Sequence, residues 1–140
     1  MRERHRVLTW ATVLIVMTAL SGCVGARHST HSGGAMIPIT DVASVAGTWT
    51  GVVSRVTGSA EGDWVEVNMK ENGTFEAVSA RQIGALLGSG TLTVTDGRIQ
   101  AAGPHGTALL TLYDRQGRAL VMDFRDRSGV RYSAELRPKM

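Results

Sequence analysis

Few side chains in this sequence have the types and spacing that catalysis or metal binding requires. His28 and His31 lie close together in a polar stretch, but a metal site needs a third ligand on a rigid scaffold, so we expect no metal there. His105 occupies a Gly-Pro-His-Gly segment typical of a turn, and no serine or cysteine nucleophile stands in a suitable context. Asp123 and Asp126 are near neighbours in sequence, yet paired catalytic carboxylates must face one cleft. We therefore expect a protein that is not an enzyme, with no catalytic residues and no cofactor.

The only cysteine, Cys23, follows an N-terminus typical of a secretory signal peptide. Arg2, Arg4 and Arg6 give a positive start, and residues 7–20 then run for fourteen residues without a charge. A membrane-spanning helix needs about 20 apolar residues, so this run is too short for a stable span. A charged start, a short apolar run and small residues before the cleavage site instead predict a cleaved signal peptide.

The segment Leu20-Ser21-Gly22-Cys23 resembles the lipobox of bacterial lipoproteins. The resemblance implies cleavage before Cys23, a diacylglycerol thioether on its sulfur, and a palmitate-type acyl chain on the new amine. Several acyl chains, at roughly 0.8 kcal/mol per buried methylene, hold a protein firmly on a membrane. Val24 is not the aspartate that retains such proteins at the inner membrane of enteric bacteria, which favours the outer membrane, facing the periplasm. The alternative is an ordinary signal peptide followed by a chance cysteine.

The sequence divides into a signal peptide (1–22), a lipid-anchored flexible tether (23–45) and a β-barrel domain (46–140). The tether prediction rests on a composition rich in Gly, Ser, Thr and Ala without an apolar period. Removing residues 1–22 leaves 118 residues with 12 basic and 11 acidic side chains, a net charge of about +1. No basic stretch is concentrated enough for nucleic acid, so we expect no nucleic-acid partner.

Short alternating runs separated by turn residues predict an all-β domain. Asn72-Gly73 and Asp96-Gly97 are typical of two-residue hairpin turns, in which both residues need a positive φ. Each turn pairs apolar residues across its strands: Val67 with Val78, and Val94 with Ile99. Four-residue loops are predicted at 114–117 and 126–129. The expected strands are 47–54, 64–70, 75–79, 90–95, 98–102, 107–113, 118–125 and 130–137, which predict a small antiparallel up-and-down barrel or sandwich of about eight strands.

One short helix is predicted between two of these strands, at 80–87. Ser79 and Gln82 have the spacing of a capping box. Ile83, Leu86 and Leu87 lie on one face of this helix, which we expect to cover an open end of the barrel. The alternative is a bulged extension of the preceding strand.

The last strands suggest a binding surface. The register of the 126–129 loop puts Leu120, Met122 and Phe124 on the same outer face as Arg131, and that of the 114–117 loop adds Leu109. Large apolar side chains gathered on a solvated face mark an interaction site or a second layer of packing. The alternative is that the short helix or the tether covers them.

Gly47-Thr48-Trp49 resembles the Gly-x-Trp motif that opens the first strand of lipocalins. The resemblance implies a tryptophan across the closed end of a barrel, with an arginine over the indole that would be Arg131 or Arg137. Trp49 is thus a candidate barrel-end residue. Short strands favour an interior filled by side chains over a roomy cavity.

Ser128-Gly129-Val130-Arg131-Tyr132 resembles part of the inhibitory loop of membrane-bound lysozyme inhibitors, although the cysteines of that family are absent. Together, these patterns predict a non-enzymatic, lipid-anchored cell-envelope lipoprotein. It contacts the membrane through lipidated Cys23, and its barrel binds an unknown envelope protein or lipid. The alternative is a lysozyme-type enzyme inhibitor or a lipocalin-like carrier of a small ligand.

Overall fold

The computed structural model describes residues 33–58, 62–80 and 88–140, which lie in one compact unit, His31–Met140. Cys23 lies outside the described residues, as does the helix expected at 80–87 apart from its first residue, Ala80, so that Ile83, Leu86 and Leu87 are not described. The described elements are β1 (Ala35–Ile37), the 3₁₀ helix η1 (Ala43–Val45), β2 (Gly47–Arg55), β3 (Asp63–Met69), β4 (Thr74–Ser79), β5 (Gly88–Thr95), β6 (Arg98–Gly103), β7 (Gly106–Asp114), β8 (Arg118–Asp126) and β9 (Arg131–Pro138).

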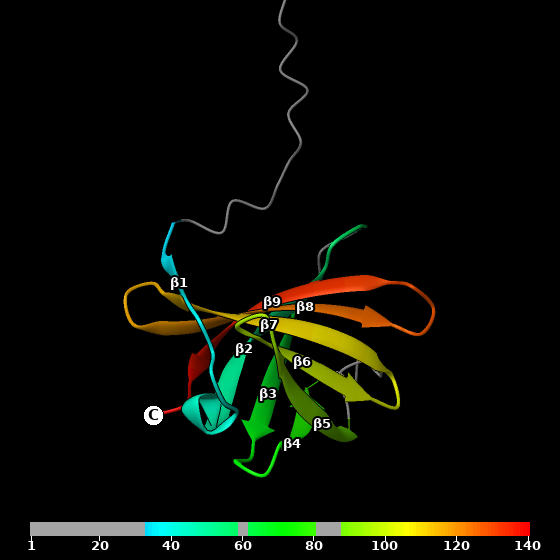
Figure 1. The fold of residues 1–140 in the computed structure, drawn as a ribbon. Helices are drawn as coiled ribbons and strands as arrows, with labels where there is room; N and C mark the ends of the chain where they lie inside the picture. The colour runs from blue at the N-terminus through cyan, green and yellow to red at the C-terminus, as the bar shows by residue number, and fades with distance from the viewer. Residues whose placement is uncertain (1–32, 59–61, 81–87) are drawn as a thin grey trace, which may run out of the picture. The chain divides into compact units, whose positions relative to one another are not determined.

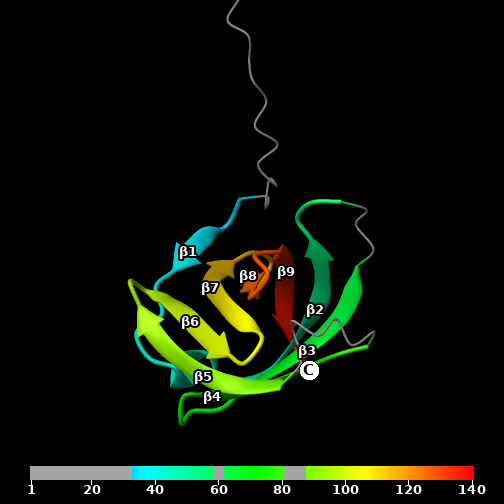
Figure 2. The ribbon, with the colours of Figure 1, turned by 90° about the vertical axis from the view of Figure 1, so that its right-hand side faces the viewer.

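Strands β2 to β9 form a closed antiparallel barrel (Figure 1). Each strand pairs with the next in the chain, and β9 pairs back with β2, so the eight strands make a ring (Figure 2). Closure pairs every strand of the ring on both sides and removes the exposed edges of an open sheet. The all-β, up-and-down prediction is confirmed, and the barrel is the form that the chain adopts rather than the sandwich.

The side chains alternate between the barrel interior and solvent, as a half-buried antiparallel strand requires. In β3, Val65, Val67 and Met69 are buried, whereas Trp64 and Asn68, on the opposite face of the strand, are exposed. The eight strands together fill the interior with aliphatic and aromatic side chains. The hydrophobic effect of this burial holds a fold that has no disulfide.

Residues 35–45 belong to the folded unit, which corrects the prediction of a tether as far as residue 45. Strand β7 continues past the end of β6, and β1 pairs with the overhanging part, Met36 opposite Tyr113. The amide of Ile39 then donates a 2.9 Å hydrogen bond to the backbone oxygen of Gly97, and the side chains of Ile39 and Val45 are buried. The unpaired overhang of β7 therefore gives this segment a partner that local composition does not reveal.

The hairpin turn at Asp96-Gly97 has the predicted form. Both residues have positive φ, 50° and 72°, and Val94 pairs with Ile99. These are the features of a two-residue type I′ turn. The predicted register of β5 and β6 is confirmed.

The register predicted at Asn72-Gly73 is wrong by one residue. The Lys70 amide donates to the backbone oxygen of Thr74 (2.8 Å), the Gly73 amide donates to that of Lys70 (3.1 Å), and Gly73 has a φ of 81°. These bonds define a three-residue loop ending in a glycine bulge, not a two-residue turn. Val67 consequently pairs with Ala77.

The registers predicted at 114–117 and 126–129 are wrong by one residue as well, since both loops are three residues long. A shift of one residue moves every side chain of a strand to the opposite face. Leu120, Met122 and Phe124 therefore point inward and are 0, 4 and 7 % exposed. The predicted outer surface made of these three side chains is corrected: they belong to the barrel interior.

Candidate functional site

One end of the barrel is closed by Trp49. Its side chain is 2 % exposed, and its indole Nε1 donates a 2.8 Å hydrogen bond to the backbone oxygen of Val45 in η1. The guanidinium of Arg118 lies 5.8 Å from the centroid of the indole and donates to the backbone oxygen of Ser44. The tryptophan, the 3₁₀ helix and the arginine form a plug at the start of β2.

The arginine over the indole is Arg118, which corrects the expectation of Arg131 or Arg137. Arg137 instead donates to the backbone oxygen of Arg115 and to the carboxylate of Glu135, both at 2.6 Å. Arg131 begins β9 and so lies at the opposite end of the barrel. The first residue of β8 reaches Trp49 because β8 and β2 run in the same direction on either side of β9.

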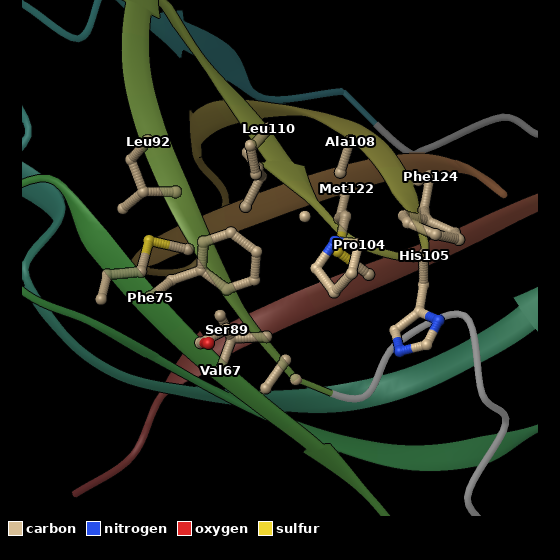
Figure 3. Close-up of a pocket in the computed structure, with 16 residues that line it drawn as sticks. Val67, Phe75, Ser89, Leu92, Pro104, His105, Ala108, Leu110, Met122 and Phe124 are labelled. Carbon is tan, nitrogen blue, oxygen red and sulfur yellow. The ribbon is translucent and has the colours of Figure 1, made fainter. Parts of the chain in front are cut away.

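A pocket opens at the other end of the barrel, where the β6–β7 turn lies (Figure 3). It has a volume of about 50 Å³. Its walls are inward-facing apolar side chains from six strands, β3 to β8, among them Val67, Leu92, Ala108, Leu110, Met122 and Phe124.

Phe75 and Gly90 shape one wall of the pocket. They are directly opposite each other on β4 and β5. A Cβ added to Gly90 would lie 2.7 Å from Cε1 of Phe75 and 2.1 Å from the backbone oxygen of Ala102. The missing side chain therefore lets the phenyl ring lie against the β5 backbone and face the cavity.

The rim adds the few polar side chains of the pocket. His105 is exposed and lies in the β6–β7 turn, and Ser89 lies near the start of β5 (Figure 3). One imidazole and one hydroxyl beside an apolar cavity suit the binding of an apolar group with a polar neighbour at the entrance. Within the described ranges, no group of three or more His, Cys, Asp or Glu is placed to hold a metal ion.

The described residues of the predicted site are distributed over four places: the pocket, the buried core, the outer wall and the closed end of the barrel. Met122 and Phe124 line the pocket, and Leu120 is buried in the core. Leu109 and Arg131 lie on the outer wall, where both line a shallow groove. Trp49 lies at the closed end of the barrel, the position that the lipocalin resemblance implies.

Sequence reasoning missed the main pocket residues, Val67, Leu92, Ala108 and His105. The alternation of apolar residues in β3, β5 and β7 was the available signal, because it marks which side chains point inward. The turn at His105 was identified, whereas its place at a pocket rim depends on how the barrel closes.

The polar groups of the 126–129 loop form hydrogen bonds with one another and with the neighbouring Val130. The carboxylate of Asp126 accepts hydrogen bonds from the Ser128 hydroxyl (2.6 Å) and the Val130 amide (2.9 Å). The hydrogen bond from Ser128, with help from backbone amides, lowers the pKa of Asp126 below its ordinary value of 3.8. The Ser-Gly pair that resembles an inhibitory loop is thus accounted for by the geometry of a hairpin.

The fold and the pocket define a small up-and-down β-barrel, compatible with a lipocalin-like architecture, that is closed at one end and hollow at the other. Comparison of the chain with protein-family profiles, with curated proteins and with solved structures finds no match. In the part of the chain that the structure describes, no helix combines the length and hydropathy that crossing a bilayer requires.

Proposed function

We propose that this protein is a non-enzymatic, lipid-anchored cell-envelope lipoprotein whose barrel docks another envelope component at its open end. The observation that carries the proposal is the apolar pocket at that end, with the opposite end closed by Trp49. A hollow, apolar barrel end is a natural receptor for one apolar group of a larger partner.

The size of the pocket favours docking over carriage of a whole ligand. Drug-sized ligands occupy pockets of roughly 300–1,000 Å³, and a cavity of about 150 Å³ accepts benzene. The volume of about 50 Å³ suits a group of a few carbon atoms. An aliphatic side chain of a protein or the end of an acyl chain fits this description.

The sequence around Cys23 supports the lipid anchor. Eleven residues lie between Cys23 and Ala35, the first residue of β1, so twelve residue-to-residue steps join the two. At 3.3–3.6 Å per residue, this stretch spans at most about 40 Å. An anchored barrel would remain within that reach of the membrane surface, where envelope lipids and proteins are its neighbours.

Site-specific crosslinking in the producing cells tests the docking end. A photoactivatable residue replaces His105 at the open end or, as a control, Arg98 in the hairpin at the closed end. We expect an adduct from position 105 that position 98 does not give, and mass spectrometry of the adduct separates a protein from a lipid partner. Equal adducts from both positions would contradict the proposal.

Variants that fill the pocket test whether the crosslinked partner enters it. Ala101 and Ala108 are inward-facing pocket residues on neighbouring strands. Ala101→Leu, or Ala108→Val if the first variant does not fold, occupies part of the cavity and should remove the adduct at position 105. An unchanged adduct with the barrel intact by circular dichroism would show that the partner does not enter the pocket.

A further inference from the structure

The outer wall of the barrel carries a second concave site, separate from the pocket. It is an open groove of about 490 Å³ across β6, β7, β8 and β9. We call it the outer groove and define it by its outward-facing side chains, Gln100, Thr107, Leu109, Asp123, Arg125 and Arg131. This set combines two cations, one carboxylate, one amide, one hydroxyl and one apolar side chain.

Arg125 and Arg131 are an unusual pair within this groove. They are directly opposite each other on β8 and β9, and both are exposed. Like charges at directly opposed positions of an antiparallel pair are destabilising. Their repulsion falls when an anion lies between them, so the pair favours an anionic ligand.

Among the described residues, four other cations form ion pairs with carboxylates, whereas Arg98 and Arg127 have none, like the two groove arginines. The four ion pairs are Lys70 with Glu76 (2.6 Å), Arg115 with Glu135 (3.3 Å), Arg137 with Glu135 (2.6 Å) and Lys139 with Glu66 (2.7 Å). Within residues 33–58, 62–80 and 88–140, the side chains of Arg125 and Arg131 make no hydrogen bond or ion pair. Both guanidinium groups are therefore available to a ligand.

The chemistry of the groove selects among anions. Guanidinium groups bind phosphate oxygens through two parallel N–H···O bonds, a geometry that an ammonium group does not offer. Asp123, two residues before Arg125, is a groove carboxylate that would repel a bare anion but accepts hydrogen bonds from hydroxyl groups. Gln100 and Thr107 can exchange further hydrogen bonds with hydroxyls, and Leu109 offers an apolar surface to the C–H face of a ring.

The geometry points to a sugar-phosphate site. The phosphate lies between Arg125 and Arg131, and the sugar hydroxyls lie toward Asp123, Gln100 and Thr107. The same chemistry occurs in soluble sugar phosphates and in the sugar-phosphate headgroups of lipids. This site does not depend on the barrel pocket or on its partner.

The test is an NMR titration of the full chain in neutral polyoxyethylene detergent, following the side-chain Nε–H signals of Arg125 and Arg131. Glucose 6-phosphate should shift both signals, and inorganic phosphate should bind more weakly. Phosphatidylinositol in the same micelles should reproduce the shifts if the source of the ligand is a lipid, and should leave them unchanged if it is soluble. Absence of a shift with both probes would overturn the proposal.

Variants test whether binding requires the two groove arginines or only the net positive charge of the protein. Arg125→Gln and Arg131→Gln should each weaken glucose 6-phosphate binding about tenfold or more, since each removes a charge-assisted interaction. Arg98→Gln removes an exposed arginine outside the groove and should leave binding unchanged. Asp123→Asn should abolish the preference over inorganic phosphate. Equal weakening by all three arginine variants would mean that only net charge matters and would overturn the site.

Discussion

The indole Nε1 of Trp49 donates a 2.8 Å hydrogen bond to the backbone oxygen of Val45, four residues earlier in the chain. This bond ties the 3₁₀ helix to the start of β2 and, together with Arg118, closes one end of the barrel. Both partners are buried, at 2 % and 0 % exposure, so the carbonyl has no access to water if the donor is lost. The indole of Trp49 therefore supplies the hydrogen-bond donor for the carbonyl of the last residue of the 3₁₀ helix, and the helix and the tryptophan form one unit.

We predict that Trp49→Phe lowers the free energy of unfolding by about 1–3 kcal/mol, because a buried acceptor is left without its donor. Urea unfolding followed by circular dichroism measures the loss. The matched control is Trp64→Phe on the outer wall, where Trp64 is 43 % exposed. That change should stay within about 0.5 kcal/mol. Equal losses in the two variants would show that the indole bond contributes nothing to the plug.

The three-residue loop at the β3–β4 turn gives the second prediction. Gly73 has a φ of 81°, a conformation that an L-residue with a side chain adopts at a cost. Gly73→Ala should therefore destabilise the barrel by about 1–2 kcal/mol. Gly33→Ala is the control, since a Cβ at Gly33 meets nothing within 4 Å and its φ is outside the left-handed region. Thermal unfolding of the two variants should differ, and identical midpoints would contradict the bulge geometry.

The strands could be predicted from the sequence because alternation of apolar and polar residues is a local property. The register could not, because a glycine with positive φ serves both a two-residue turn and a three-residue loop with a bulge. Asp96-Gly97 takes the first form and Asn72-Gly73 the second. The same one-residue difference placed Met122 and Phe124 outside in the prediction, whereas they line the pocket.

Other features could not be predicted because they depend on pairing between strands that are far apart in the sequence. The pocket exists because β9 pairs with β2 and closes the ring, a contact between residues more than seventy positions apart such as Val53 and Ala134. The segment around Met36 is ordered because β7 extends past β6. The lipocalin resemblance predicted that an arginine would lie over the indole of Trp49. It could not predict that this residue is Arg118, because that depends on the order of strands around the barrel.

The loop around Asp126 predicts a pH dependence of stability. The hydrogen bond from Ser128 lowers the pKa of Asp126 in the folded protein below the ordinary value of 3.8, which the unfolded chain retains. The ionised carboxylate therefore favours folding above that pH, and its contribution is lost as the pH falls through the folded pKa. We expect the difference in unfolding free energy between the wild type and Asp126→Asn to shrink as the pH is lowered from 6 to about 2.5.

Ser128→Ala provides the check on this assignment, because it removes the largest cause of the lowered pKa. The carboxyl ¹³C shift of Asp126, followed by NMR through an acid titration, should then show a pKa closer to 3.8. A titration curve that does not move would mean that the Ser128 hydroxyl is not the group that stabilises the carboxylate.

The last prediction concerns the anchor at Cys23. If the Leu-Ser-Gly-Cys segment is processed as its lipobox resemblance implies, cells fed an alkyne fatty acid should label the wild type and not Cys23→Ser. Ser29→Ala, six residues further on, is the control and should label normally. Thioether and amide linkages resist hydroxylamine, whereas a reversible palmitoyl thioester is cleaved, so retention of the label after hydroxylamine distinguishes the two kinds of acylation. An unlabelled wild type with a free thiol at Cys23 would instead identify an ordinary cleaved signal peptide, and equal labelling of wild type and Cys23→Ser would place the acyl group elsewhere.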